Sequence, residues 1–184
     1  MNQPFLLILT TIFFINFNSK HVSLTKKNNK IETAISTIEE LSTYSKTSFG
    51  IENTYKTKID FNPKTGKITY KKFINEYNKV YNYEISFYLN DIIKTSMEHK
   101  IHKPEYSNDL YVIWIDFKSK GKTIEWKITE YEKGKKYAAF TEKEFKDYMV
   151  LNCNNNELPF SYHKKYLDSW KTILGIESST EKKD

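Results

Sequence analysis

Residues 81–89 alternate between apolar and polar side chains, and this alternation constrains the fold more than any other stretch of the chain. Tyr81, Tyr83, Ile85, Phe87 and Leu89 stand at the odd positions. Successive side chains of a β-strand point to opposite faces of its sheet, so the pattern predicts a strand with one face on a core. A half-buried strand of this kind is typical of antiparallel sheets, whose second face meets water.

The neighbouring sequence supplies partners for such a strand. Further strands are predicted over residues 55–61, 68–74, 92–101, 110–117, 122–131 and 135–140. Pro63 and Gly66 indicate a hairpin turn between the first two of these, and a turn is also expected around Gly121, ahead of the strand over 122–131. Residues 92–101 also fit a helix, but their strand-rich surroundings favour a strand. The total is about seven antiparallel strands.

Helical spacing of apolar residues is found near the two ends of the chain. An amphipathic helix is predicted within residues 31–45, with a stripe made of Ile31, Ala34, Ile35, Ile38 and Leu41. Thr141 and Glu144 have the spacing of a capping box, which predicts a helix through Phe145, Tyr148 and Met149 to Cys153. A last helix is predicted to follow Pro159-Phe160, with Gly175 as its C-cap and an apolar stripe of Tyr166, Leu167, Trp170, Ile173 and Leu174.

These elements predict an α+β fold with an antiparallel β-rich core, an N-terminal helix and C-terminal capping helices. Their order is typical of a pleckstrin-homology-like barrel, in which two bent sheets pack together and a helix closes one end. An open antiparallel sheet with helices on one face is the alternative. Residues 31–175 are expected to form a single domain, residues 20–30 a flexible basic lead-in, and residues 176–184 a disordered tail.

Residues 4–17 form a continuous apolar run, PFLLILTTIFFINF. Its length suits the core of a signal peptide and falls short of the roughly 20 residues that span a bilayer. Residues 1–19 are therefore predicted to be a signal peptide, and the protein to be secreted or periplasmic. The alternatives are an uncleaved membrane anchor and a buried first element of the domain. Contact with a membrane is expected only through this apolar segment.

The charge of the chain does not favour a nucleic-acid partner. The formal net charge is +6, yet every basic residue is Lys, and these lysines are mixed with 23 acidic residues. Arginine, which makes the commonest specific contact to a base, does not occur in the sequence. Cys153 is the sole cysteine, so an internal disulfide is excluded.

Two histidines are the main candidates for chemistry. His99 and His102 lie three residues apart, with Glu98 and Glu105 nearby. On a helix these residues could present two imidazoles and a carboxylate to zinc, whereas on a strand residues three apart face opposite sides. No further ligand stands at a recognisable spacing. No catalytic residue, cofactor site or metal site is therefore assigned.

Other pairings of reactive residues have simpler explanations. Cys153 and His163 could form a nucleophile and base, but a lone cysteine at the inward end of a predicted helix fits a packing role better. Glu39 and Glu40 are expected to be a solvated charge pair on the outer face of the first helix. The sequence contains no nucleophile elbow, glycine-rich phosphate loop or H-E-x-x-H motif. These features favour a protein that is not an enzyme.

The aromatic residues divide between two expected locations. One group falls on predicted core faces: Tyr83, Phe87, Trp114, Trp126 and Trp170. Tyr70, Tyr88 and Tyr111 are expected on the opposite faces, where a strip of tyrosines could form a binding surface.

From Asp91 onward the chain resembles a pattern in uncharacterised exported proteins of AT-rich bacteria, the Bacteroidota in particular. The matching residues are Lys122-Thr123-Ile124-Glu125-Trp126, the segment 145–153, and Pro159-Phe160. In such proteins paired strands that end in this stretch precede a helix, a cysteine, a polar loop and Pro-Phe. The resemblance is structural and implies no activity.

The sequence thus predicts a non-catalytic exported domain that binds a protein, a peptide or a small ligand outside the cytoplasm. One alternative is a divergent hydrolase or transferase around His99 and His102. Another is a secreted inhibitor or immunity-type protein that blocks one partner by surface complementarity. An enzyme requires a concave pocket with converging polar groups, whereas a binding module requires a sheet edge or an aromatic patch.

Overall fold

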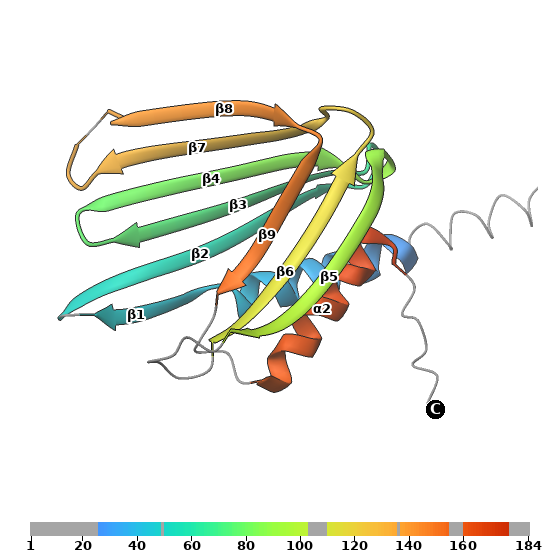
Figure 1. Ribbon diagram of the computed structural model, residues 1–184, viewed down its shortest axis with the longest axis horizontal. Coiled ribbons are helices and arrows are strands. Elements are labelled where there is room, and N and C mark those ends of the chain that lie inside the picture. Colours follow the sequence, from blue (N-terminus) through green and yellow to red (C-terminus); the bar gives the residue numbers. More distant parts are fainter. Residues whose placement is uncertain (1–25, 49, 103–109, 136, 155–159, 177–184) are drawn as a thin grey trace, which may run out of the picture.

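The computed structural model describes residues 26–48, 50–102, 110–135, 137–154 and 160–176, which form two helices and nine strands (Figure 1). An N-terminal helix covers residues 26–41. The strands are β1 (Tyr44–Ser48), β2 (Ile51–Asn62), β3 (Lys67–Glu76), β4 (Lys79–Tyr88), β5 (Ile92–His102), β6 (Leu110–Ser119), β7 (Ile124–Glu132), β8 (Phe140–Lys146) and β9 (Tyr148–Asn154). A 3₁₀ turn, η1 (Leu89–Asp91), links β4 to β5, and helix α2 (Phe160–Leu174) comes last.

The strands build two antiparallel sheets. One has six strands in the order β1-β2-β3-β4-β7-β8, and the other has three in the order β5-β6-β9. The chain passes from the larger sheet to the smaller one at η1 and again at Asp147, between β8 and β9. In Figure 1 the smaller sheet lies near the end of the larger sheet where η1 is found, and the larger sheet projects beyond it.

The predicted α+β class with antiparallel strands is confirmed. The strands expected from residue 55 to residue 131 correspond to β2 through β7, including the ambiguous segment that is now β5. The turn after β2 is also as expected, since Gly66 has φ 69° and its N–H donates to the carbonyl of Asn62 at 2.8 Å. The described strands do not close into a barrel, because no strand pairing joins the six-stranded sheet to the three-stranded sheet.

The helix predicted from the Thr141–Glu144 capping box is wrong, because this segment forms β8 and β9. The short strand expected over 135–140 is likewise displaced, and only Phe140 belongs to β8. A capping box is worth on the order of 1 kcal/mol, whereas two full ladders form when β8 pairs with β7 and β9 pairs with β6. Burial of Leu151 against β6 adds to that advantage.

The N-terminal helix matches its predicted apolar stripe but not its predicted limits. All five stripe residues are at least 92% buried: Ile31, Ala34, Ile35, Ile38 and Leu41. The helix ends at residue 41, and β1 takes up residues that were expected to be helical. Residues 26–30, part of the predicted flexible lead-in, are helical.

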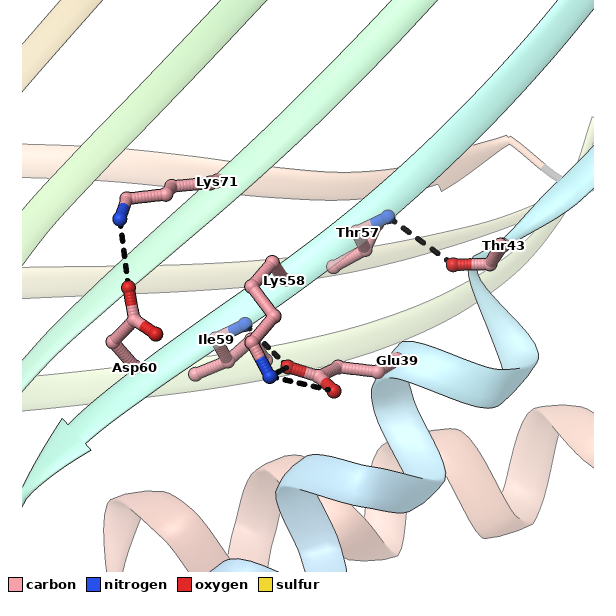
Figure 2. A network of polar contacts seen from close by, with 7 residues as sticks. All are labelled: Glu39, Thr43, Thr57, Lys58, Ile59, Asp60 and Lys71. Atoms are coloured by element: carbon pink, nitrogen blue, oxygen red, sulfur yellow. Dashed lines mark hydrogen bonds and ion pairs between the residues drawn. The ribbon is translucent and has the colours of Figure 1, made fainter.

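The end of this helix protects part of the edge of β2. Strand β1 pairs with β2 only as far as Tyr55, so the next N–H groups on that edge need other partners. The N–H of Thr57 donates to Thr43 Oγ1 at 3.2 Å, and that of Ile59 donates to Glu39 Oε1 at 2.7 Å (Figure 2). An exposed row of N–H groups would invite pairing with another chain, which these side chains prevent.

Both helices and the inner faces of both sheets share one core. Its most deeply buried large side chains are Trp170, Tyr166, Phe87 and Phe117. Phe87 of the six-stranded sheet and Phe117 of the three-stranded sheet have ring centroids 4.7 Å apart, so the sheets are in direct contact here. Gly175 ends α2 as predicted, with φ 69° and a 2.9 Å bond from the N–H of Ile176 to the carbonyl of Lys171. Within the described part of the chain, no helix is long and apolar enough to cross a membrane.

Candidate functional site

The inner face of the six-stranded sheet becomes more exposed along its strands. Ile68 and Phe87 face each other in the β3–β4 register and are at most 1% exposed, and Tyr70 and Ile85 in the next row are at most 5% exposed. The third row, with Lys72 opposite Tyr83, is only half-buried. Side chains alternate between the two faces of the sheet in all three rows, so the alternation does not explain the difference in exposure. The smaller sheet and the helices cover only one half of the inner face, and the third row lies in the other half.

A cleft opens where that cover ends. It has a volume of about 300 Å³ and lies between β3, β4 and β7 on one side and β9 on the other. Its walls are formed by Tyr70, Lys72, Ile74, Tyr83, Ile85, Trp126, Met149, Val150 and Leu151. Pockets for small ligands begin near this size and combine an apolar lining with a few polar groups. Here the polar groups of the lining are the hydroxyls of Tyr70 and Tyr83, the indole of Trp126 and the ammonium of Lys72.

Trp126 is held in place at the margin of the cleft. Its predicted burial is corrected, because the indole packs against the core but remains half-exposed. The Lys146 Nζ atom lies 4.2 Å from the ring centroid, a cation–π contact, and is also 3.0 Å from Glu144 Oε2. The ion pair with Lys146 lowers the pKa of the Glu144 carboxyl. A ligand in the cleft would therefore meet a positioned indole with charged groups beside it.

Tyr83 presents a neutral phenol to the same cleft. Burial raises its pKa above the usual value, and the negative charges that Tyr81, Glu76 and Glu130 can carry raise it further. The Tyr81 and Tyr83 rings have centroids 6.3 Å apart and an interplanar angle of 27°. Because the phenol stays protonated at neutral pH, its hydroxyl can donate a hydrogen bond.

Tyrosines continue along the inner face beyond the cleft. Tyr44 of β1 stacks on Tyr55 of β2 with ring centroids 4.6 Å apart, and the Tyr55 hydroxyl donates to Glu76 Oε1. Together with Tyr81 and Tyr83 these rings form an aromatic shelf, the part of the inner face that the smaller sheet leaves uncovered. The shelf offers flat, half-buried surfaces next to the cleft.

The outer face of the same sheet carries a second hollow of different character. Its volume is about 370 Å³, and its lining includes Lys71, Glu84 and Lys127. These three residues stand side by side in the register of β3, β4 and β7, so opposite charges alternate across the sheet. Such alternation stabilises a solvated surface. The inner cleft is therefore the stronger candidate for a ligand site.

The structure places the two histidines on a strand, but their side chains are outside its described part. His99 and His102 both belong to β5, opposite Ile113 and Leu110 of β6. Their side chains and that of Glu98 lie outside the described part of the structure, as does all of Glu105. Within the described residues, no three His, Cys, Asp or Glu side chains gather in a metal-binding group.

The proposed cysteine–histidine pair involves two different elements. Cys153 is in β9 opposite Ile113, so its expected position at the end of a helix is wrong, and its side chain lies outside the described residues. His163 lies in α2 and is 2% exposed. The carboxylate pair is also corrected: Glu39 is half-buried and bonded to β2, and only Glu40 is exposed.

The predicted tyrosine strip does not form from the residues assigned to it. Tyr70 is 5% exposed and belongs to the core, Tyr88 is 42% exposed, and the Tyr111 side chain lies outside the described residues. Phe87 and Trp170 are buried as expected. The aromatic surface comes instead from Tyr81 and Tyr83, which share the face of the buried Ile85 and Phe87. Their alternation was visible in the sequence, but the limit of the covering sheet was not.

Comparison with protein-family models, with curated proteins and with solved structures gives no match for this chain. Its function is therefore inferred from the cleft and the surfaces around it.

Proposed function

We propose that the protein is a non-catalytic exported domain that binds a small, partly apolar ligand in the cleft between its two sheets. The observation that carries the proposal is the open cleft of about 300 Å³ whose lining includes Tyr70, Tyr83, Trp126 and Met149. Aromatic rings and a thioether favour contact with apolar or ring-shaped groups. Lys72 also belongs to the lining and adds a polar group to it.

Two features of the chain support the rest of the proposal. The apolar run of residues 4–17 supports export, with signal-peptide cleavage as the favoured route and a retained anchor as the alternative. The bent antiparallel sheets and the helix that follows them support a pleckstrin-homology-like arrangement left open on one side.

A fluorescent probe tests the cleft directly. 1-Anilinonaphthalene-8-sulfonate combines a ring system with one negative charge, so it suits the proposed chemistry. The full chain should bind it with saturating fluorescence, and Tyr83→Ala should weaken the binding roughly tenfold, the loss expected for one well-packed aromatic contact. Trp126→Ala should have a similar effect.

Tyr88→Ala is the matched control. Tyr88 is a tyrosine on the same strand, 42% exposed and outside the cleft lining, so its loss should leave probe binding unchanged. Circular dichroism and a thermal melt must show that each variant is folded. Equal losses for Tyr83→Ala and Tyr88→Ala, or saturable binding that survives both cleft substitutions, would show that the probe does not occupy the cleft.

A further inference from the structure

Three connections between strands meet at one end of the molecule. The N–H of Leu89 donates to the carbonyl of Gly66 at 3.0 Å, which joins η1 to the β2–β3 turn. The N–H of Lys120 donates to the carbonyl of Asp91 at 2.8 Å, which joins the β6–β7 turn to η1. These turns therefore form one continuous surface, and Figure 1 shows them at the end opposite the free hairpins of the larger sheet.

This surface is strongly basic. We define the basic end by the lysines of these turns and of the strand ends next to them: Lys64, Lys67, Lys94, Lys118, Lys120 and Lys122. All except the half-buried Lys67 are exposed, and none forms an ion pair with a described residue. The acidic residues closest along the chain are Asp116, two residues from Lys118, Asp91, three from Lys94, and Glu125, three from Lys122, and all three are half-buried.

Several lysines elsewhere in the larger sheet form ion pairs. Ion pairs join Lys79 to Glu130 at 2.6 Å, Lys143 to Glu125 at 2.6 Å and Lys146 to Glu144 at 3.0 Å. Ion pairing thus neutralises these three lysines, whereas the lysines of the basic end form no ion pair with a described residue and are compensated only in part, by Glu125 near Lys67 and by Glu144 near Lys122.

Apolar side chains are exposed among the lysines of this end. Ile93 is 55% exposed and Tyr88 is 42% exposed, on either side of η1. Large apolar and aromatic side chains set among lysines are typical of surfaces that enter the headgroup region of a membrane. The rings and aliphatic groups reach the acyl boundary while the ammonium groups meet phosphates.

The chain enters the domain at the same end. In Figure 1 the N-terminal helix begins on the same side of the molecule as these turns, next to the end of α2, and its first described residues include Lys26, Lys27 and Lys30, all exposed. The eight residues 18–25 separate the helix from the apolar run of residues 4–17. Eight residues span at most roughly 28 Å. If the apolar run lies in a bilayer, the basic end is therefore within reach of that bilayer's surface.

From these observations we propose that the basic end docks on a membrane surface that carries anionic phospholipids. The apolar run holds the domain against that surface before cleavage or in its absence, and the lysines then neutralise the lipid phosphates. The aromatic shelf lies toward the opposite ends of β3 and β4 and stays accessible, whereas the cleft residues Trp126 and Met149 border the basic end, since Met149 follows Tyr148, the register partner of Lys118. The proposal concerns a surface separate from the cleft, so either can fail without the other.

Vesicle co-sedimentation of the full chain provides the test. Vesicles of phosphatidylcholine are compared with vesicles that also contain about 30% phosphatidylglycerol, at an ionic strength of about 0.15 M. Both bind the apolar run, so the difference between them reports the charge contribution. The wild-type chain should bind the anionic vesicles at least tenfold more tightly. The variant K94Q/K120Q/K122Q should lose most of that preference, and Ile93→Ser should weaken binding to both kinds of vesicle.

The matched control is K56Q/K127Q/K135Q, which removes the same charge from exposed lysines outside the basic end. It should retain the preference for anionic vesicles. Equal losses in the two triple variants would overturn the proposal, because net charge and not the basic end would then explain binding. So would a wild-type chain without any preference, or a K94Q/K120Q/K122Q variant that loses affinity for a DNA duplex but not for anionic vesicles.

Discussion

The Glu39 carboxylate accepts a 2.7 Å hydrogen bond from the backbone N–H of Ile59, which joins the N-terminal helix to the edge of β2. Glu39 Oε1 also lies 3.2 Å from Lys58 Nζ, but that lysine is largely exposed and adds little. Ile59 itself is 3% exposed, so water does not easily replace the carboxylate. This bond connects two elements that the sequence places twenty residues apart.

Glu39→Ala should lower the free energy of unfolding by about 1–3 kcal/mol, because it leaves a buried N–H without its acceptor. Glu40→Ala removes the same group one position along, where the side chain is exposed, and should change stability by less than about 0.5 kcal/mol. Urea denaturation followed by circular dichroism gives both values. If both variants lost the same unfolding free energy, the hydrogen bond to Ile59 would contribute no stability beyond the effect of removing one negative charge from the helix.

Trp170→Ala and Trp126→Ala should differ in cost. Trp170 belongs to α2 and is fully buried, with its indole against the ring of Tyr70. Its replacement should therefore lower the free energy of unfolding by about 3–5 kcal/mol. Trp126 is half-exposed at the cleft, and its removal should cost roughly 1–2 kcal/mol. Denaturant unfolding of both variants measures the difference. A loss for Trp126→Ala as large as that for Trp170→Ala would place its indole in a closed core and eliminate the open cleft.

The raised pKa of Tyr83 predicts a loss of stability at alkaline pH. In the unfolded chain the phenol ionises near pH 10, while burial and the charges of its neighbours keep it protonated to higher pH in the folded chain. The contribution of the Tyr83 phenol to the free energy of unfolding is therefore complete below pH 10. It is lost as the pH rises through the pKa of the phenol in the folded chain.

Tyr83→Phe should remove this part of the pH dependence. The quantity to measure is the difference in unfolding free energy between the wild-type chain and the variant, from about pH 8 to about pH 11. As the pH rises, the wild-type chain should lose stability relative to Tyr83→Phe. A constant difference would mean that the folded phenol ionises as it does in the unfolded chain, and that its hydroxyl is not shielded in the cleft.

The apolar N-terminus predicts processing on export. When the full chain is expressed in a bacterium, the protein recovered outside the cytoplasm should lack residues 1–19, as intact-mass analysis and N-terminal sequencing would show. Cleavage follows because a signal peptidase removes such a segment after translocation. Recovery of the intact chain in the membrane fraction would support the retained anchor, and recovery of the intact chain in the cytoplasm would contradict export.

Local sequence was enough to predict those helices and strands whose own pattern of apolar residues identifies the type of element. The stripe from Ile31 to Leu41 predicted a helix and its buried face, and the alternation of Ile85 and Phe87 predicted a strand and its buried face. In both cases the period of the apolar residues matches the geometry of the element, so no distant partner is needed to identify it. The turn at Gly66 and the C-cap at Gly175 were predictable for the same reason.

Tertiary structure decided what depends on distant partners. Residues 140–154 carry a helix-capping signal, yet they are strands, because β7 and β6 offer them two ladders. Tyr83 and Phe87 share one face of β4, but the smaller sheet covers Phe87 and leaves Tyr83 half-exposed, and this difference creates the cleft. The sequence by itself thus determined the α+β class and which face of each strand is apolar. Where those faces are covered, and hence where a ligand can enter, was decided by the packing of one sheet over half of the other.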